Sequence, residues 1–175
     1  MYAKRFGDTV LRERAINQIF IMDDFMKDEI SGLYFHGWDD SKEMEWADPD
    51  TGLSAEIWGR AVGWYAVAIL DILEYIPKNH KAVPRLMQIE RDLLKNLVKY
   101  QDKKTGMWYE VLDKPDCEGN WIESSCSCLF TYSYAKAVLM GIIDDAEYKD
   151  IIKKAYNGII ETSVSFDSEG NITLD

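Results

Sequence analysis

Three side chains near the middle of the sequence could together bind a sugar acid: Trp58, Arg60 and Trp64. Indole faces pack against the apolar face of a sugar ring, and a guanidinium pairs with a carboxylate through two parallel hydrogen bonds. The spacing of four between Arg60 and Trp64 places both on one side of a helix. The same residues also suit a helix with two aromatic core residues and a surface arginine, so both interpretations stay open on these residues alone.

These side chains belong to a segment, residues 46–76, that reads as a turn followed by a helix. The turn at 48–52 combines Asp, Pro and Gly, which favour fixed φ angles, local hydrogen bonds and a left-handed position. We expect Ser54 to cap the helix and Glu56 to lie in its first turn. Apolar residues then recur at intervals of three and four until Pro77 ends the helix.

The rest of the chain predicts further helices, separated by short extended segments. Amphipathic periodicity and small-residue content indicate helices over residues 8–27, 80–101 and 124–141. Asp144-Asp145 is expected to cap a last helix that runs to about Thr162. Aromatic segments over 33–38 and 107–112 are expected to be extended, and 166–174 is expected to form a hairpin.

The order of these elements repeats along the chain. An amphipathic helix is followed by a turn with glycine, an aromatic extended piece, a loop and a helix rich in small residues; SGLYF and TGMWY occupy the same place in successive units, and Gly170 begins a third turn. Helical hairpins curved around an axis form an α/α toroid with the aromatic loops at one end. A plain bundle of helical hairpins explains the periodicity equally well.

Composition narrows the classes of partner. The chain has 175 residues and a net charge of −11, which argues against nucleic acid or an anionic membrane as a partner. No apolar run is long enough to span a bilayer, and the N-terminus lacks the apolar core of a signal peptide. Three cysteines form no disulfide framework, which favours a reducing, cytoplasmic location. Two distant histidines without a matching cysteine pair predict no metal site.

Four blocks in order carry a resemblance to a known family: GLYFHGWD (32–39), WADPDTGLSAEIWGRAVGWYAVAILDIL (46–73), YQDKKTGMWYEVLD (100–113) and NWIESSCSCLFTYSYAKAV (120–138). The chain resembles glycoside hydrolase family 105, the unsaturated rhamnogalacturonyl hydrolases, which are related to the unsaturated glucuronyl hydrolases of family 88. The resemblance covers nearly the whole chain. It implies an all-α (α/α)6 barrel and, as ligand, an unsaturated uronic-acid oligosaccharide produced by pectin lyases.

The resemblance also implies a mechanism and a set of binding residues. In the family an Asp is thought to protonate the C4–C5 double bond and to activate water for attack at C5; the hydrated sugar then opens and releases its neighbour. No metal or organic cofactor is needed. By match to the family's motifs, the implied substrate-binding residues are His36, Trp58, Arg60, Trp64, Trp121, Ser124 and Ser125.

The chain departs from the family pattern at the proton donor. The family's catalytic Asp lies upstream of the position of Met1, so we assign no catalytic residue. We expect residues 1–175 to be a single middle or C-terminal segment of the domain, truncated at both ends and containing about half of the toroid. Asp39, Asp48 and Glu123 are the alternative acids, each of which also suits a loop, turn or first-turn carboxylate.

Three hypotheses follow from this pattern. The chain is part of a hydrolase acting on unsaturated uronides, or a non-catalytic sugar-binding remnant, or a structural domain of α-hairpins. Half of a toroid would leave helix flanks uncovered, and large apolar patches are rarely left bare. We therefore also expect self-association, or pairing with the other segments of the enzyme.

Overall fold

The computed structural model describes residues 1–174 and consists mainly of helices. In chain order the elements are α1 (Tyr2–Phe6), α2 (Thr9–Phe25), α3 (Gly59–Tyr75), α4 (Val83–Leu97) with the 3-10 turn η1 (Val98–Tyr100), β1 (Trp108–Tyr109), β2 (Ile122–Glu123), α5 (Ser124–Leu139), α6 (Asp145–Ser163), β3 (Val164–Phe166) and β4 (Ile172–Leu174). Among the described residues, no helix has both the length and the hydropathy required to cross a bilayer.

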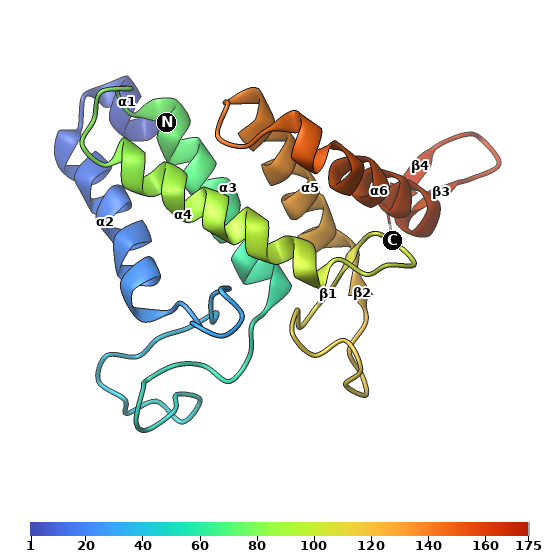
Figure 1. The fold of residues 1–175 in the computed structure, drawn as a ribbon, viewed down its shortest axis with the longest axis horizontal. Helices are drawn as coiled ribbons and strands as arrows, with labels where there is room; N and C mark the ends of the chain where they lie inside the picture. Colours follow the sequence, from blue (N-terminus) through green and yellow to red (C-terminus); the bar gives the residue numbers. More distant parts are fainter. Residues whose placement is uncertain (175) are drawn as a thin grey trace.

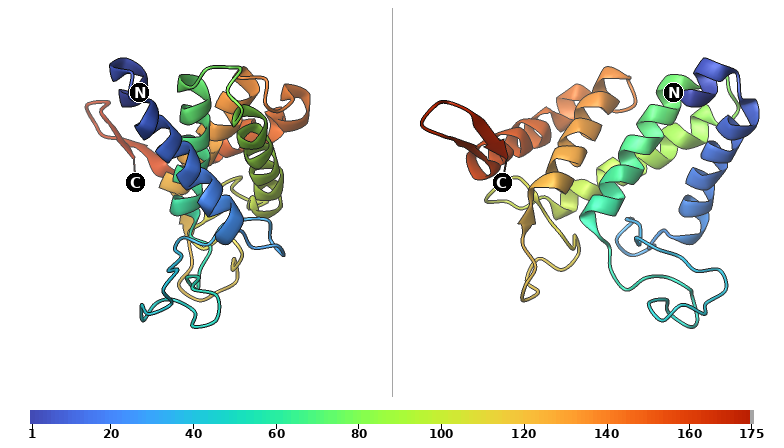
Figure 2. Two further views of the ribbon diagram at one scale, coloured as in Figure 1. Left: turned by 90° about the vertical axis from the view of Figure 1, so that its left-hand side faces the viewer. Right: turned by 180° about the vertical axis from the view of Figure 1, so that it is seen from behind.

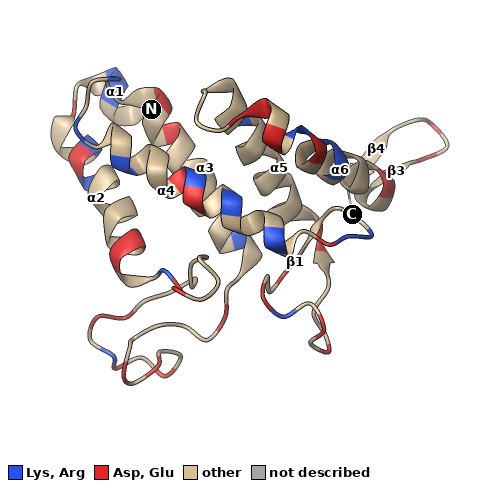
Figure 3. Cartoon of the chain, in the orientation of Figure 1, with Lys and Arg blue, Asp and Glu red and all other residues tan. Residues whose placement is uncertain are grey.

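The helices form two layers (Figures 1 and 2). Helices α3 and α5 pack side by side, and α4 and α6 cover them on one side, while α2 lies at the edge beside α3. The long loops that precede α3 and α5 lie at the same end of the molecule. Figure 3 shows acidic residues spaced along these loops and charges of both signs along α4. The arrangement confirms alternating outer and inner helices with the aromatic loops gathered at one end.

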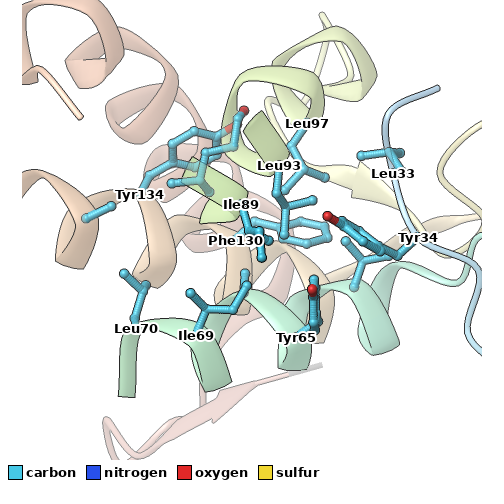
Figure 4. Close-up of a cluster of buried hydrophobic side chains, with 14 of the residues drawn as sticks. Leu33, Tyr34, Tyr65, Ile69, Leu70, Ile89, Leu93, Leu97, Phe130 and Tyr134 are labelled. Atoms are coloured by element: carbon cyan, nitrogen blue, oxygen red, sulfur yellow. The ribbon is translucent and has the colours of Figure 1, made fainter. Parts of the chain in front are cut away.

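The core lies between the two layers (Figure 4). Aliphatic side chains of α4 and α3 pack against aromatic residues from α5 and from the segment that follows α2; the fully buried ones include Leu33, Ile69, Leu70, Leu93, Leu97, Phe130 and Tyr134. Two tyrosine hydroxyls in this core donate to backbone carbonyls: Tyr65 to Ile19 at 3.0 Å and Tyr134 to Leu94 at 2.6 Å. These bonds tie α2 to α3 and α4 to α5, so the core positions the inner helices that carry the candidate site.

A five-residue turn, Asp-x-x-Ser/Thr-Gly, occurs at 28–32 and again at 102–106. In each, the Asp carboxylate accepts from the backbone N–H three residues on, at 2.8 Å and 2.6 Å. The glycine then adopts a positive φ of 70° at Gly32 and 76° at Gly106. The same turn is present at 48–52, where Gly52 has φ 79°. The motif therefore belongs to the chain's local turn chemistry, and the repeat is carried by the helices around it.

The start of α3 differs from the prediction. Ser54 does not cap the helix and Glu56 is not in its first turn, because α3 begins at Gly59. The Ser54 hydroxyl instead accepts from the Gly37 N–H at 3.1 Å, and the Glu56 carboxylate pairs with Lys114 at 2.6 Å. Residues 53–58 are held extended by tertiary contacts, namely bridges from Leu53 and Trp58 to other loops.

Other boundaries also shift. The segment 33–38 makes only isolated bridges, and within 107–112 only β1 is a strand. The helix expected over 80–101 begins at Val83, with Pro84 in its first turn, and ends in the tighter turn η1. The short helix α1 was not expected. The last helix with its Asp144 cap and the hairpin of β3 and β4 are confirmed, while Asp175 lies outside the described residues.

Candidate functional site

Three extended segments meet where α3 and α5 begin, and we call them the site ribbon: residues 57–59, 108–112 and 121–123. Strands β1 and β2 pair with Trp108 opposite Glu123. On the other side, Trp58 bridges to Val111, and the Gly59 N–H donates to the Glu110 carbonyl at 2.7 Å. The ribbon fixes the ends of two inner helices relative to each other, and it carries Trp58 and Trp121 of the candidate side chains.

Arg60, in the first turn of α3, is the central cation of the site. Its guanidinium carbon lies 4.7 Å from the centroid of the Trp58 ring. Two carboxylates flank it, with Nη1 3.6 Å from Glu123 and Nη2 3.8 Å from Glu110. Both distances exceed a hydrogen bond, and the buried Nε has no partner in the structure. The guanidinium is held by charge and by an aromatic face, and its side-chain donors make no hydrogen bond among the described residues.

His36 joins this cluster from the segment that follows α2. Its ring lies edge-on to Trp58, with centroids 6.0 Å apart. Nδ1 lies 3.0 Å from the Glu56 carbonyl and 3.1 Å from the Ser54 hydroxyl. Because a carbonyl only accepts, Nδ1 carries the proton in the neutral ring. Nε2 is then an acceptor, and the exposed edge of the imidazole faces solvent.

The remaining predicted residues lie around this cluster. Trp64 is one helical turn beyond Arg60 and is 60% exposed, and Trp121 precedes β2 and is 54% exposed. Ser125 donates to the Glu123 carboxylate, which connects it to the Arg60 side of the site. Ser124, the first residue of α5, is half-buried. The structure thus places Trp58 against both His36 and Arg60, while Trp64 and Trp121 are exposed on the neighbouring elements.

Glu123 is a structural carboxylate in this site. It caps α5 by accepting from the Cys126 N–H at 2.8 Å. Burial acts to raise the pKa of Glu123, but the hydrogen bonds from Ser125 and Cys126 and the charge of Arg60 outweigh burial and lower it below its ordinary value. Glu123 is therefore ionised at neutral pH and is poorly suited to donate a proton.

The two other alternative acids are turn carboxylates. Asp39 accepts from the N–H groups of Met44 and Glu43 at 3.0 Å and 2.9 Å, and the first of these bonds is the main cause that lowers its pKa. Asp48 accepts from Thr51 N–H at 2.8 Å, which likewise lowers its pKa. Both carboxylates are fixed in their ionised form by the loop that contains them.

The candidate site is an open face rather than a closed cavity. Two large hollows of the described residues lie elsewhere: one of about 740 Å³ between α2 and the start of α4, and one of about 600 Å³ between α1, α2 and the end of α3. Neither is lined by any of the predicted site residues. Among residues 1–174, no group of three His, Cys, Asp or Glu side chains is arranged to hold a metal ion.

Sequence reasoning missed Glu110. Its charge is unremarkable in the sequence, since it is a single acidic residue within the aromatic extended segment 107–112. Only the pairing of the site ribbon brings it to Arg60. Its position directly after β1 was the available signal, because residues beyond a short strand often reach a site formed by the adjoining loops.

Comparisons with known proteins identify the family of the chain. The model of Glycosyl Hydrolase Family 88 matches residues 1–175. Protein Atu3128 of Agrobacterium fabrum is 34% identical over 172 residues, which cover 97% of this chain and 72% of that protein. The unsaturated rhamnogalacturonyl hydrolase YesR of Bacillus subtilis is 30% identical over 188 residues, which cover 97% of this chain and 49% of YesR.

Solved structures show the same fold. A family 105 glycoside hydrolase from C. acetobutylicum superposes with a TM-score of 0.94 at 36% identity, covering 99% of this chain and 48% of that one. The unsaturated glucuronyl hydrolase of Bacillus sp. GL1, at 13% identity and a TM-score of 0.68, supports the fold alone. The chain spans about half the length of these solved proteins and has the fold of about half of an (α/α)6 barrel. It belongs to the glycoside hydrolases of family 88 and its relatives of family 105.

Proposed function

We propose that this chain forms the substrate-binding part of an enzyme that hydrolyses unsaturated galacturonyl or glucuronyl oligosaccharides by hydration of the 4,5 double bond. The family and the name of the relative YesR support this reaction class. In the reaction, a proton is added to the C4–C5 double bond and water adds at C5. The resulting sugar opens and releases its neighbour. The proposed reaction uses no cofactor.

The observation that carries the proposal is the state of Arg60. An arginine stacked on an indole, with a buried Nε that lacks a partner and with no hydrogen bond to its two flanking carboxylates, is prepared to bind an oxyanion. The uronate carboxylate is the group on this substrate class that matches the guanidinium fork. Exposed indoles at Trp64 and Trp121 supply surfaces for sugar rings.

The other predicted residues complete this binding face. Nε2 of His36 can accept a hydrogen bond from a sugar hydroxyl, and Trp58 holds both the imidazole and the guanidinium in place. The hydroxyls of Ser124 and Ser125 lie at the start of α5, where the N-terminal end of the helix favours negative charge. We assign these serines to substrate binding at the same face.

We expect binding without turnover from residues 1–175 on their own. Asp39, Asp48 and Glu123 are each ionised and occupied by local hydrogen bonds, so none is suited to protonate a double bond. This observation favours a second candidate, a sugar-binding protein without hydrolase activity. The proposals differ in whether an acid from elsewhere in the enzyme completes the site.

The test uses an unsaturated galacturonyl-rhamnose disaccharide and the pure chain. Calorimetry should detect binding, and the ultraviolet absorbance of the double bond should stay constant. Loss of absorbance would contradict the assignment of the acids and would identify a proton donor within the chain. Failure to bind would contradict the proposed function as a whole and would favour a purely structural role for the helical hairpins.

Self-association stays a prediction. Several apolar side chains at the α1 and α2 edge are exposed, including Tyr2, Phe6, Val10 and Leu11. Light scattering at micromolar concentration should report species larger than a monomer, and a stable, well-folded monomer would contradict the expectation.

A reducing, cytoplasmic location is likewise proposed, from the free thiols of Cys117, Cys126 and Cys128.

A further inference from the structure

Glu110 occupies a rigid position in the middle of the site ribbon. Its carbonyl accepts from the Gly59 N–H at 2.7 Å, and its own N–H donates to the Trp121 carbonyl at 2.9 Å. It is therefore bonded through its backbone to both neighbouring segments. A side chain on a backbone fixed from two sides is held where it can meet a ligand with little loss of entropy on binding.

The register of the ribbon places Glu110 beside an exposed indole. Tyr109 pairs with Ile122, and continuing the antiparallel register by one residue sets Glu110 opposite Trp121. Directly opposite residues project from the same side of an antiparallel pair, with Cβ atoms about 5 Å apart. Glu110 thus lies between the indole of Trp121 and the guanidinium of Arg60, which is 3.8 Å away.

The two carboxylates that flank Arg60 differ in what their oxygens do. The Glu123 carboxylate accepts from the Ser125 hydroxyl and the Cys126 N–H, and its side chain is 9% exposed. The Glu110 carboxylate accepts no side-chain or backbone hydrogen bond in the described part of the chain, and its side chain is 21% exposed. The carboxylate oxygens of Glu123 are therefore used in hydrogen bonds within the fold, whereas those of Glu110 are available as acceptors.

We propose that Glu110 is a ligand-binding residue that accepts hydrogen bonds from hydroxyls of a sugar ring packed on Trp121. A carboxylate has about four lone-pair sites and can accept from two neighbouring hydroxyls at once. Hydrogen bonds to a charged group are stronger than those between neutral groups. The inference rests on the proposed function, and it adds a specificity: Glu110 repels a ligand carboxylate from its own side and leaves that group to Arg60.

The experiment measures binding by tryptophan fluorescence and calorimetry with two probes. One is the unsaturated galacturonyl-rhamnose disaccharide, and the other is its methyl ester, in which the carboxylate is blocked. The variants are Glu110→Ala and Glu110→Gln, with Glu118→Ala as the matched control, because Glu118 is exposed in the loop between β1 and β2. Circular dichroism and thermal unfolding verify that each variant is folded.

Glu110→Ala should weaken binding of both probes by about tenfold or more, the scale of a hydrogen bond to a charged group. Glu110→Gln, which keeps one acceptor oxygen, should lie between wild type and Glu110→Ala, and Glu118→Ala should match wild type. A loss confined to the free acid would overturn the inference, because Glu110 would then act only by positioning Arg60.

Equal binding by wild type and by folded Glu110 variants would also overturn it, while leaving the proposed function intact. If the wild-type chain binds neither probe, the proposed function fails and the inference fails with it. Each outcome therefore separates the role of Glu110 from the role of the site as a whole.

Discussion

Helices α3 and α5 are joined at both ends by a cation between two carboxylates, and the two clusters differ in how the cation is held. At the end away from the loops, Lys136 of α5 donates to Asp71 at 2.7 Å and lies 2.8 Å from Glu74, both of α3. At the loop end, Arg60 of α3 lies 3.6 Å and 3.8 Å from its carboxylates. The cation is therefore within hydrogen-bonding distance of its two carboxylates at one end, whereas at the other end it lies beyond that distance.

The difference indicates which cluster is structural. The Lys136 side chain is only 15% exposed and its ammonium has direct partners on the neighbouring helix, so its hydrogen-bonding capacity serves helix pairing. Burial acts to lower the pKa of Lys136, but the bonds to Asp71 and Glu74 outweigh it and raise that pKa. Arg60 keeps its donors unpaired beside exposed indoles. A cation that the fold does not satisfy is the better candidate for ligand binding.

The largest effect should come from replacing Arg60, the cation that makes no hydrogen bond to its flanking carboxylates. Arg60→Lys keeps the charge but loses the planar fork, so it should weaken binding of the unsaturated disaccharide by about 1–3 kcal/mol. Thermal stability should change little, because the Arg60 side chain makes no hydrogen bond among residues 1–174. Calorimetry and a melting curve on the same sample measure both quantities, and a drop in stability with unchanged affinity would place Arg60 with the structural cations.

Another buried acidic group, Glu90, sharpens the contrast, because no cation pairs with it in the described part of the chain. Glu90 of α4 is fully buried, and neither carboxyl oxygen has a partner in the structure. Burial raises the pKa of Glu90 well above its ordinary value, so the folded protein holds it protonated. As pH rises above the ordinary value of a glutamate, the unfolded chain loses this proton while the folded chain keeps it. Stability therefore falls with rising pH.

Glu90→Gln should remove this part of the pH dependence. Relative to wild type, the variant should gain stability as the pH rises from 5 to 8, since a neutral amide replaces a group whose ionisation favours unfolding. Urea unfolding at the two pH values measures the gain. Glu161→Gln on the exposed face of α6 is the control. An equal pH slope in wild type and Glu90→Gln would show that Glu90 finds a partner.

The smallest effect should come from replacing Lys136, the cation in direct contact with both of its carboxylates. Lys136→Met keeps most of the length of the side chain and removes the charge, and it should lower the free energy of unfolding by about 0.5–1 kcal/mol. The value is modest because Asp71 and Glu74 are 51% and 50% exposed and therefore screened by solvent. Affinity for the disaccharide should stay the same. Weaker binding of the disaccharide by a Lys136→Met variant of normal stability would contradict the assignment of Lys136 to a purely structural role.

Local chemistry was predicted well from the sequence. The turn at 48–52, the glycine turns at 31–32 and 105–106 and the Asp144 cap depend on neighbouring residues alone, and the structure has all of them. The amphipathic helices were also expected, although their ends shift by a few residues. Ends are less predictable because a helix stops where tertiary contacts take its next backbone or side-chain groups, as happens to Ser54.

The site was predictable only in part, for a related reason. Trp58, Arg60 and His36 were selected by residue type and by resemblance, and the fold brings them together. Glu123 was expected at the start of a helix, and it caps α5 there through the Cys126 N–H. The contacts of Glu123 and Glu110 with Arg60 depend on segments that are far apart in the chain, so the residue types did not indicate them.

By itself the sequence determined the helices, the turns, the family and the side chains that could bind a sugar acid, because these depend on local propensity, periodicity and motif. Only the tertiary structure decided where α3 begins and which carboxylates face Arg60. It also decided that α3 and α5 are joined by direct ion pairs at one end, whereas the cation at the other end makes no hydrogen bond to its carboxylates. Those features come from contacts between segments about 50 to 65 residues apart, such as Arg60 with Glu110 and Glu123 and Lys136 with Asp71, and no local pattern encodes such distances.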